Sequence, residues 1–143
     1  MANRTTLDEL LAKAGAQERR KRPSEEEHRL QAACIRWFTL AYPKLYGRLF
    51  AVPNGGRRDM VTGAKLKAEG VLPGVADLIL LARRGGYGAL LIEMKTGKGR
   101  QSDSQRWWQQ TVTADGEYKY VVCRSIDDFM REVEGYLNRQ ADE

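Results

Sequence analysis

Glu93 and Lys95 stand two residues apart at the end of the apolar run GALLIEMK. Because successive side chains of a strand alternate between its faces, both point to one face and Met94 points to the other. Asp77 stands just inside the preceding apolar run, VADLILLA. Two carboxylates with a lysine beside them are the groups that metal-assisted hydrolysis of a phosphodiester bond requires.

The two apolar runs are separated by RRGGY, whose paired glycines favour a tight turn. We therefore expect a hairpin of two largely buried strands. If the hairpin folds about position 85, Asp77 lies opposite Glu93 and Leu80 lies near Leu90. The register thus predicts that both carboxylates meet at one end of the sheet.

Two carboxylates forced together repel, which raises the pKa of one of them unless a cation lies between them. Oxygen ligands favour Mg²⁺ or Mn²⁺, and a neighbouring lysine can orient water or neutralise charge on phosphate. The alternative is that Asp77 caps a turn while Glu93 and Lys95 form a solvent-facing pair. An isolated E-x-K tripeptide carries little weight; its combination with Asp77 and the basic turn KTGKGR favours the catalytic interpretation.

The remaining pattern predicts an α/β fold with a small mixed sheet flanked by helices, in the order α-β-β-β-α-β-α. Capping and turn residues set the element ends. The expected elements are a helix from Ser24 with Glu27 completing a capping box, a strand around 48–52, a brief helix ending at Gly70, the two hairpin strands, a helix from Ser102 with Gly116 beyond its end, a strand over 118–123 and a helix over 125–137.

Charge is distributed unevenly along the 143 residues, whose formal net charge is +5. Residues 125–143 carry a net −4, so the chain before them carries +9. Basic clusters stand at ERRKRP (18–23), GGRRDMVTGAKLK (55–67) and KTGKGR (95–100). Three such clusters in one small domain favour a polyanionic partner.

Length and composition predict one domain, with residues 1–23 as a basic helix and tether before a domain over 24–143. We expect Cys34 and Cys123 to be buried free thiols. No apolar stretch is long enough to span a membrane and the N-terminus does not resemble a secretory signal, so we expect a cytoplasmic protein. A phosphate-binding P-loop and a zinc site both lack the residues they need.

The segments GVLPGVADLILL and YGALLIEMKTGKGRQSDSQRWW resemble the core of the VRR-NUC (virus-type replication-repair nuclease) family, a branch of the restriction-endonuclease-like PD-(D/E)xK nucleases. The resemblance covers residues 24–137, although Ala76 stands where family members commonly have proline. It implies catalysis and metal binding on Asp77, Glu93, Lys95 and Gln105, the last of these in the helix that follows. The backbone carbonyl of Met94 is implied as a further metal ligand. An acid in the opening helix is also implied, for which Glu27 is the best match and Glu25 and Glu26 are alternatives.

The resemblance further implies a Mg²⁺- or Mn²⁺-dependent DNA endonuclease that acts as a homodimer on branched DNA such as Holliday junctions. The family name suggests a role in repair, recombination or phage replication, in a bacterial or phage-infected cell. Salt-dependent DNA contacts are expected from Asn54, Arg57, Arg58, Lys98 and Arg100. The alternative is a nucleic-acid-binding module on a nuclease-like scaffold, with little or no cleavage.

Overall fold

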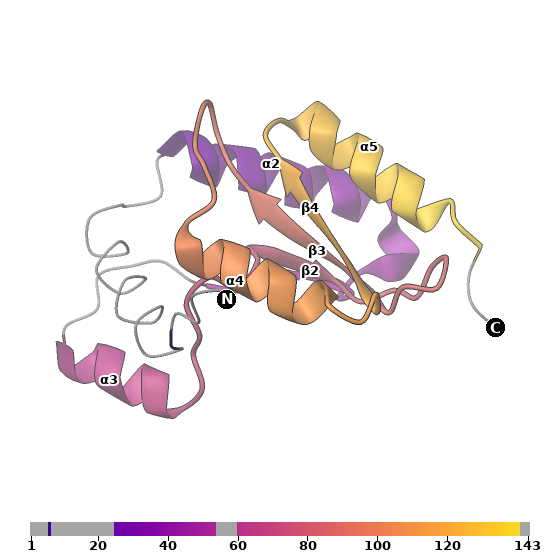
Figure 1. Ribbon diagram of the computed structural model, residues 1–143. Helices are drawn as coiled ribbons and strands as arrows, with labels where there is room; N and C mark the ends of the chain where they lie inside the picture. The colour runs from indigo at the N-terminus through magenta and orange to yellow at the C-terminus, as the bar shows by residue number, and fades with distance from the viewer. Residues whose placement is uncertain (1–5, 7–24, 54–59, 141–143) are drawn as a thin grey trace.

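The computed structural model describes Thr6 and residues 25–53 and 60–140, and the expected helix and strand order is confirmed in this part of the chain (Figure 1). The predicted N-terminal helix and the Ser24 cap lie outside the described residues. The elements are α2 (Glu25–Ala41), the 3-10 helix η1 (Pro43–Leu45), β1 (Leu49–Ala51), α3 (Met60–Ala68), β2 (Leu78–Leu80), β3 (Ala89–Met94), α4 (Asp103–Thr113), β4 (Tyr118–Cys123) and α5 (Ile126–Leu137).

The sheet has the strand order β1-β2-β3-β4. The pairs β1–β2 and β2–β3 are antiparallel, whereas β4 runs parallel to β3, so the sheet is mixed as expected. Leu80 pairs with Leu90 and Leu78 pairs with Ile92, which confirms the hairpin register. One residue further along this register, Asp77 stands opposite Glu93.

The helices cover the sheet in two layers (Figure 1). On one face, α2 and α5 contribute Cys34, Phe38, Phe129 and Val133 to the main core. The sheet contributes the alternate residues of its central strands to the same core, namely Leu78, Leu80, Leu90, Ile92 and Met94. On the other face, α4 covers a smaller apolar cluster, so β3 is buried along its whole length.

Tyr136 belongs to the main core but was missed by the apolar pattern of α5. Its side chain is 1% exposed, and its hydroxyl donates to the carbonyl of Ala82 at 2.5 Å. A buried tyrosine hydroxyl needs such a partner, because burial without a hydrogen bond would be costly. The C-terminal helix is therefore attached to the end of β2 by a specific polar contact as well as by packing.

The cysteines are buried free thiols, as predicted. Burial raises the pKa of Cys34 to about 11 and that of Cys123 to about 12. Both thiols are therefore protonated and unreactive at neutral pH. Within the described residues, no helix combines the length and apolar character needed to cross a membrane.

The first turn of α4 is fixed by a reciprocal capping box. The Ser102 hydroxyl accepts from the backbone N–H of Gln105 at 3.2 Å, and the backbone N–H of Ser102 donates to Gln105 Oε1 at 2.8 Å. Together these bonds satisfy two backbone donors that the helix itself leaves unpaired. Trp108, further along α4, packs in the smaller cluster with Leu91.

Gly74 lets the segment before β2 approach this first turn. Its φ is +87°, and a Cβ atom there would lie 2.4 Å from the carbonyl oxygen of Ser104 and 2.9 Å from the backbone nitrogen of Gln105. Only glycine fits this contact without a shift of backbone, because a backbone atom cannot move aside as a side chain can. The chain leading to Asp77 and the start of α4 are thereby held against each other.

Replacing Gly74 by alanine should destabilise the protein more than the same change at Gly116, which also has positive φ (+75°) but open space around it. Both changes introduce the left-handed backbone cost of about 1–2 kcal/mol, and Gly74→Ala adds a steric clash of about 1–3 kcal/mol. Urea unfolding of the two variants measures the difference. Equal losses of unfolding free energy would contradict the close-contact role of Gly74.

Candidate active site

Glu93 is the centre of the candidate site, on the face of the sheet that α4 covers. It is 1% exposed and stands in the middle strand of the sheet, at the end of an otherwise apolar run. Within residues 25–53 and 60–140, no other charged side chain is as deeply buried. A buried carboxyl group must be neutralised or compensated by polar partners, so its surroundings define what this position can do.

Asp77 meets Glu93 across the hairpin, as the sequence predicted. The charge of Asp77 acts on the carboxyl group of Glu93, so the two carboxyl groups are close neighbours. Asp77 Oδ2 also accepts from the backbone N–H of Met94 at 2.7 Å, and the Asp77 carbonyl accepts from Val52 N at 2.9 Å. Both the backbone and the side chain of Asp77 are therefore fixed by neighbouring strands.

Lys95 lies on the same face as Glu93, while Met94 packs in the core on the opposite face. The Lys95 ammonium nitrogen lies 3.9 Å from Glu93 Oε1, and the lysine side chain is 15% exposed. The alternative of a solvent-facing Glu93–Lys95 pair is wrong, because the glutamate is inside the protein. The lysine instead places a positive charge beside the buried Glu93 carboxyl group.

Gln105 holds Glu93 from the first turn of α4. Its side-chain nitrogen Nε2 donates to Glu93 Oε1 at 2.8 Å. Its Oε1 accepts from the Ser102 backbone, so the capping box that starts the helix also fixes the orientation of this amide. The family resemblance implied a role for Gln105 in the site, and the structure places its amide on Glu93.

Tyr120 is a site residue that sequence analysis missed. Its hydroxyl donates to Glu93 Oε2 at 3.2 Å. In the parallel pairing of β3 and β4, Tyr120 stands opposite Leu91, so it points to the same face as Glu93. The alternation of side chains along YKYVVC shows which residues share a face, but the register with β3 is needed to know which face that is.

Burial and the charge of Asp77 raise the pKa of Glu93 from 4.5 to about 10, while Lys95 and Tyr120 act in the opposite direction. Burial and the charge of Glu93 in turn raise the pKa of the Tyr120 hydroxyl above its usual range. Without a cation, Glu93 is therefore protonated at neutral pH. This agrees with the expectation that one member of the carboxylate pair has a raised pKa.

The carboxylate pair fits a small divalent cation. Both donors are hard oxygens, and a cation between them would take the place of the proton that the pair otherwise requires. Among the described residues, no group of three or more His, Cys, Asp or Glu could hold a metal. Mg²⁺ is commonly bound through one or two carboxylates while it keeps several waters, so two carboxylates are a sufficient protein contribution.

Glu27, the acid predicted from the opening helix, does not join Asp77 and Glu93 in a group of three possible metal ligands. Glu27 lies in the first turn of α2 and is half-buried. The body of α2 packs on the sheet face opposite to α4. The role of Glu27, like the alternatives Glu25 and Glu26 and the Met94 carbonyl, stays a prediction.

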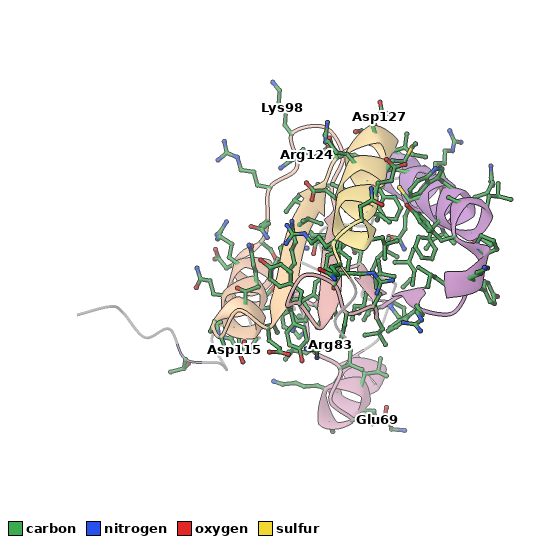
Figure 2. The ribbon with its side chains drawn as sticks, turned by 90° about the vertical axis from the view of Figure 1, so that its right-hand side faces the viewer. Glu69, Arg83, Lys98, Asp115, Arg124 and Asp127 are labelled. Atoms are coloured by element: carbon green, nitrogen blue, oxygen red, sulfur yellow. The ribbon has the colours of Figure 1, made fainter. Side chains whose placement is uncertain are left out.

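The basic turn after β3 is fixed at one end of the molecule. Arg124 Nη1 donates to the carbonyls of Gly97 and Gly99, at 3.2 and 2.7 Å, so the turn is tied to the end of β4. Lys98 and Arg100 are exposed in this turn, and Figure 2 shows Lys98 extending outward at the same end as Arg124. The other predicted DNA contacts, Asn54, Arg57 and Arg58, lie outside the described residues.

The raised pKa of Glu93 predicts an inverse dependence of stability on pH for the metal-free protein. Glu93 keeps its proton in the folded state up to about pH 10 but loses it near 4.5 when unfolded, so the folded state binds one proton more between these values. The free energy of unfolding should therefore fall as pH rises through this window, by at most about 1.4 kcal/mol per pH unit.

Chemical unfolding at several pH values, with a chelator present, measures this slope. Glu93→Gln should remove most of it and stabilise the metal-free protein at pH 8, because the amide is neutral at every pH. Glu117→Gln is the matched control, since the Glu117 side chain is 48% exposed. A slope that survives in Glu93→Gln would contradict the assignment.

Comparison with known proteins gives the family of the chain. The VRR-NUC domain matches residues 25–127, which include Asp77, Glu93, Lys95 and Gln105. A solved structure described as a VRR_NUC domain protein superposes with a TM-score of 0.69 at 26% sequence identity, over 82% of this chain and 92% of that one. No curated protein matches the chain. The chain therefore belongs to the VRR-NUC family of nuclease-type domains.

Proposed function

We propose that this protein is a Mg²⁺- or Mn²⁺-dependent endonuclease that hydrolyses phosphodiester bonds of DNA. The observation that supports the proposal most strongly is the buried Glu93 facing Asp77, with Lys95 on the outer side of the pair. If the carboxyl pair had no ligand, burying Glu93 beside Asp77 would lower the stability of the fold without any functional gain. A pair that holds a catalytic cation accounts for both its burial and its charged neighbour.

Asp77 and Glu93 would hold the cation through their carboxylate oxygens. When bound, the cation supplies Lewis-acid polarisation of the phosphate and lowers the pKa of water. Lys95 would orient the attacking water and neutralise the charge that develops on the phosphate, because its ammonium nitrogen lies 3.9 Å from Glu93 Oε1. Gln105 would keep the Glu93 carboxylate in one orientation.

The DNA backbone would approach over the basic turn at 95–100. This turn follows directly after Lys95, and Arg124 holds its shape through two carbonyl contacts. Lys98 and Arg100 are exposed there and could contact phosphates on either side of the cleaved bond. Since such contacts release counterions, binding should weaken steeply with added salt.

The proposal extends to branched DNA and to a homodimer, on the strength of the family resemblance. Resolution of a four-way junction requires two symmetric nicks, and one carboxylate pair per chain supplies one. A dimer would place two such sites on the two strands to be cut. A role in repair, recombination or phage replication follows from that substrate.

Replacing Lys95 by alanine should lower the cleavage rate at least about 100-fold without preventing DNA binding, because the charge stabilises the transition state more than the ground state. The measurement is cleavage of labelled single-stranded, duplex, flap and four-way-junction DNA, with Mg²⁺, with Mn²⁺ and with a chelator. Lys44→Ala is the control, since Lys44 is exposed and lies outside the site.

Undiminished metal-dependent cleavage by Lys95→Ala would refute the role of Lys95. If the wild-type protein binds these DNAs but cleaves none of them with either metal, the protein is instead a nucleic-acid-binding module on a nuclease-like scaffold.

A mixed dimer tests the two-site proposal. Light scattering should give the mass of a dimer at micromolar concentration. A heterodimer of the wild-type chain and Lys95→Ala should nick a four-way junction on one strand only, whereas the wild-type homodimer should produce paired nicks. A monomer in solution, or paired nicks from the heterodimer, would count against one site per chain acting in a dimer.

A further inference from the structure

We propose that Tyr120 is a positioning residue for Glu93, and that Gln101 sets the direction of the Tyr120 hydroxyl. This inference rests on the proposed function, because it concerns how the chain prepares Glu93 to hold a cation. Tyr120 lies on β4 and Gln101 lies just before α4. The two residues thus join elements that bracket Glu93 from different directions.

The hydrogen bonds around Tyr120 have a single consistent direction. Gln101 Nε2 donates to the Tyr120 hydroxyl at 3.1 Å and to Gln109 Oε1 at 2.8 Å. A phenol hydroxyl has one proton, so a hydroxyl that accepts from Gln101 has that proton free for Glu93 Oε2, 3.2 Å away. The Gln101 amide therefore selects the hydroxyl orientation in which Tyr120 donates to the carboxyl group.

Tyr120 and Gln105 together hold both oxygens of Glu93. Gln105 donates to Oε1 at 2.8 Å and Tyr120 donates to Oε2. Two donors on the two oxygens fix the plane of the carboxyl group, and each oxygen keeps a further lone pair available to a ligand. Glu93 is thereby oriented before any cation arrives.

Gln101 is itself held in place. Its backbone carbonyl accepts from Arg106 Nη1 at 2.9 Å, and its side-chain nitrogen Nε2 donates to Gln109; both partners lie on α4. The Tyr120 ring packs near Trp108, with ring centroids 6.2 Å apart, so removal of the hydroxyl alone leaves the ring contact. Loss of the hydrogen bond can therefore be separated from loss of packing.

Tyr120→Phe is the direct test, and Tyr118→Phe is the matched control. Tyr118 lies two residues earlier in β4 and is 40% exposed. Isothermal titration with MnCl₂ should show Mn²⁺ binding weakened about 10-fold in Tyr120→Phe and unchanged in Tyr118→Phe, as is typical when a partner of a metal ligand is lost. The Mn²⁺ concentration for half-maximal cleavage should rise by the same factor. A purely structural role would alter stability without moving either value.

Gln101→Ala tests the direction of the chain of hydrogen bonds. It should weaken Mn²⁺ binding by a few-fold in the wild-type background, because the hydroxyl is then free to turn away from Glu93. The same change should have no effect in the Tyr120→Phe background, where the hydroxyl is absent. Such non-additivity is expected only if both residues act through the same contact.

The outcomes separate this inference from the proposed function. If the wild-type protein binds Mn²⁺ and cleaves DNA, but Tyr120→Phe and Gln101→Ala match it in both measurements, the positioning role is overturned and the nuclease proposal stands. If the wild-type protein neither binds Mn²⁺ nor cleaves DNA, both proposals are overturned. If Tyr120→Phe proves insoluble, Gln101→Ala alone decides the inference. Unchanged Mn²⁺ binding in Gln101→Ala would then overturn it, and weakened binding would support it.

Discussion

The contact between Glu93 and Asp77 is the constraint on which the rest of the site depends. Two neighbouring carboxyl groups, one of them fully buried, are tolerated only if one is protonated or a cation compensates their charge, because ionised carboxylates close together repel strongly in a medium of low dielectric constant. The raised pKa of Glu93 is the metal-free form of this condition. Everything around the pair either holds these groups together or compensates their charge.

Gln105 and Gly74 stabilise the fold around the start of α4 and also position the carboxylate pair. Gln105 closes the capping box of α4 with one end of its amide and holds Glu93 with the other. Gly74 allows the chain that leads to Asp77 to pack against the backbone of the same helix turn. As a result, the start of α4 cannot move away from the sheet without disturbing the carboxylate pair.

Much of this arrangement was predictable because it depends on local patterns. The glycine pair in RRGGY and the two apolar runs specified the hairpin, and the hairpin register brought Asp77 to Glu93. Alternation along the strand separated Met94 from its two polar neighbours. The serine at 102 signalled the start of α4 through its capping role.

Tyr120, Gln101 and Tyr136 were not predictable in the same way, because their roles depend on contacts between elements that are distant in sequence. From the sequence alone, a tyrosine in an amphipathic helix or an edge strand is expected to be an ordinary half-buried residue. Its hydroxyl acquires a function only when another strand or turn is placed against it. The sequence by itself determined the order of elements and the hairpin, since these follow from periodicity and turn chemistry, and with them the position of the candidate site residues Asp77 and Glu93. Only the tertiary structure decided how Glu93 is held, because the parallel pairing of β3 with β4 and the packing of α4 bring its hydrogen-bond donors together.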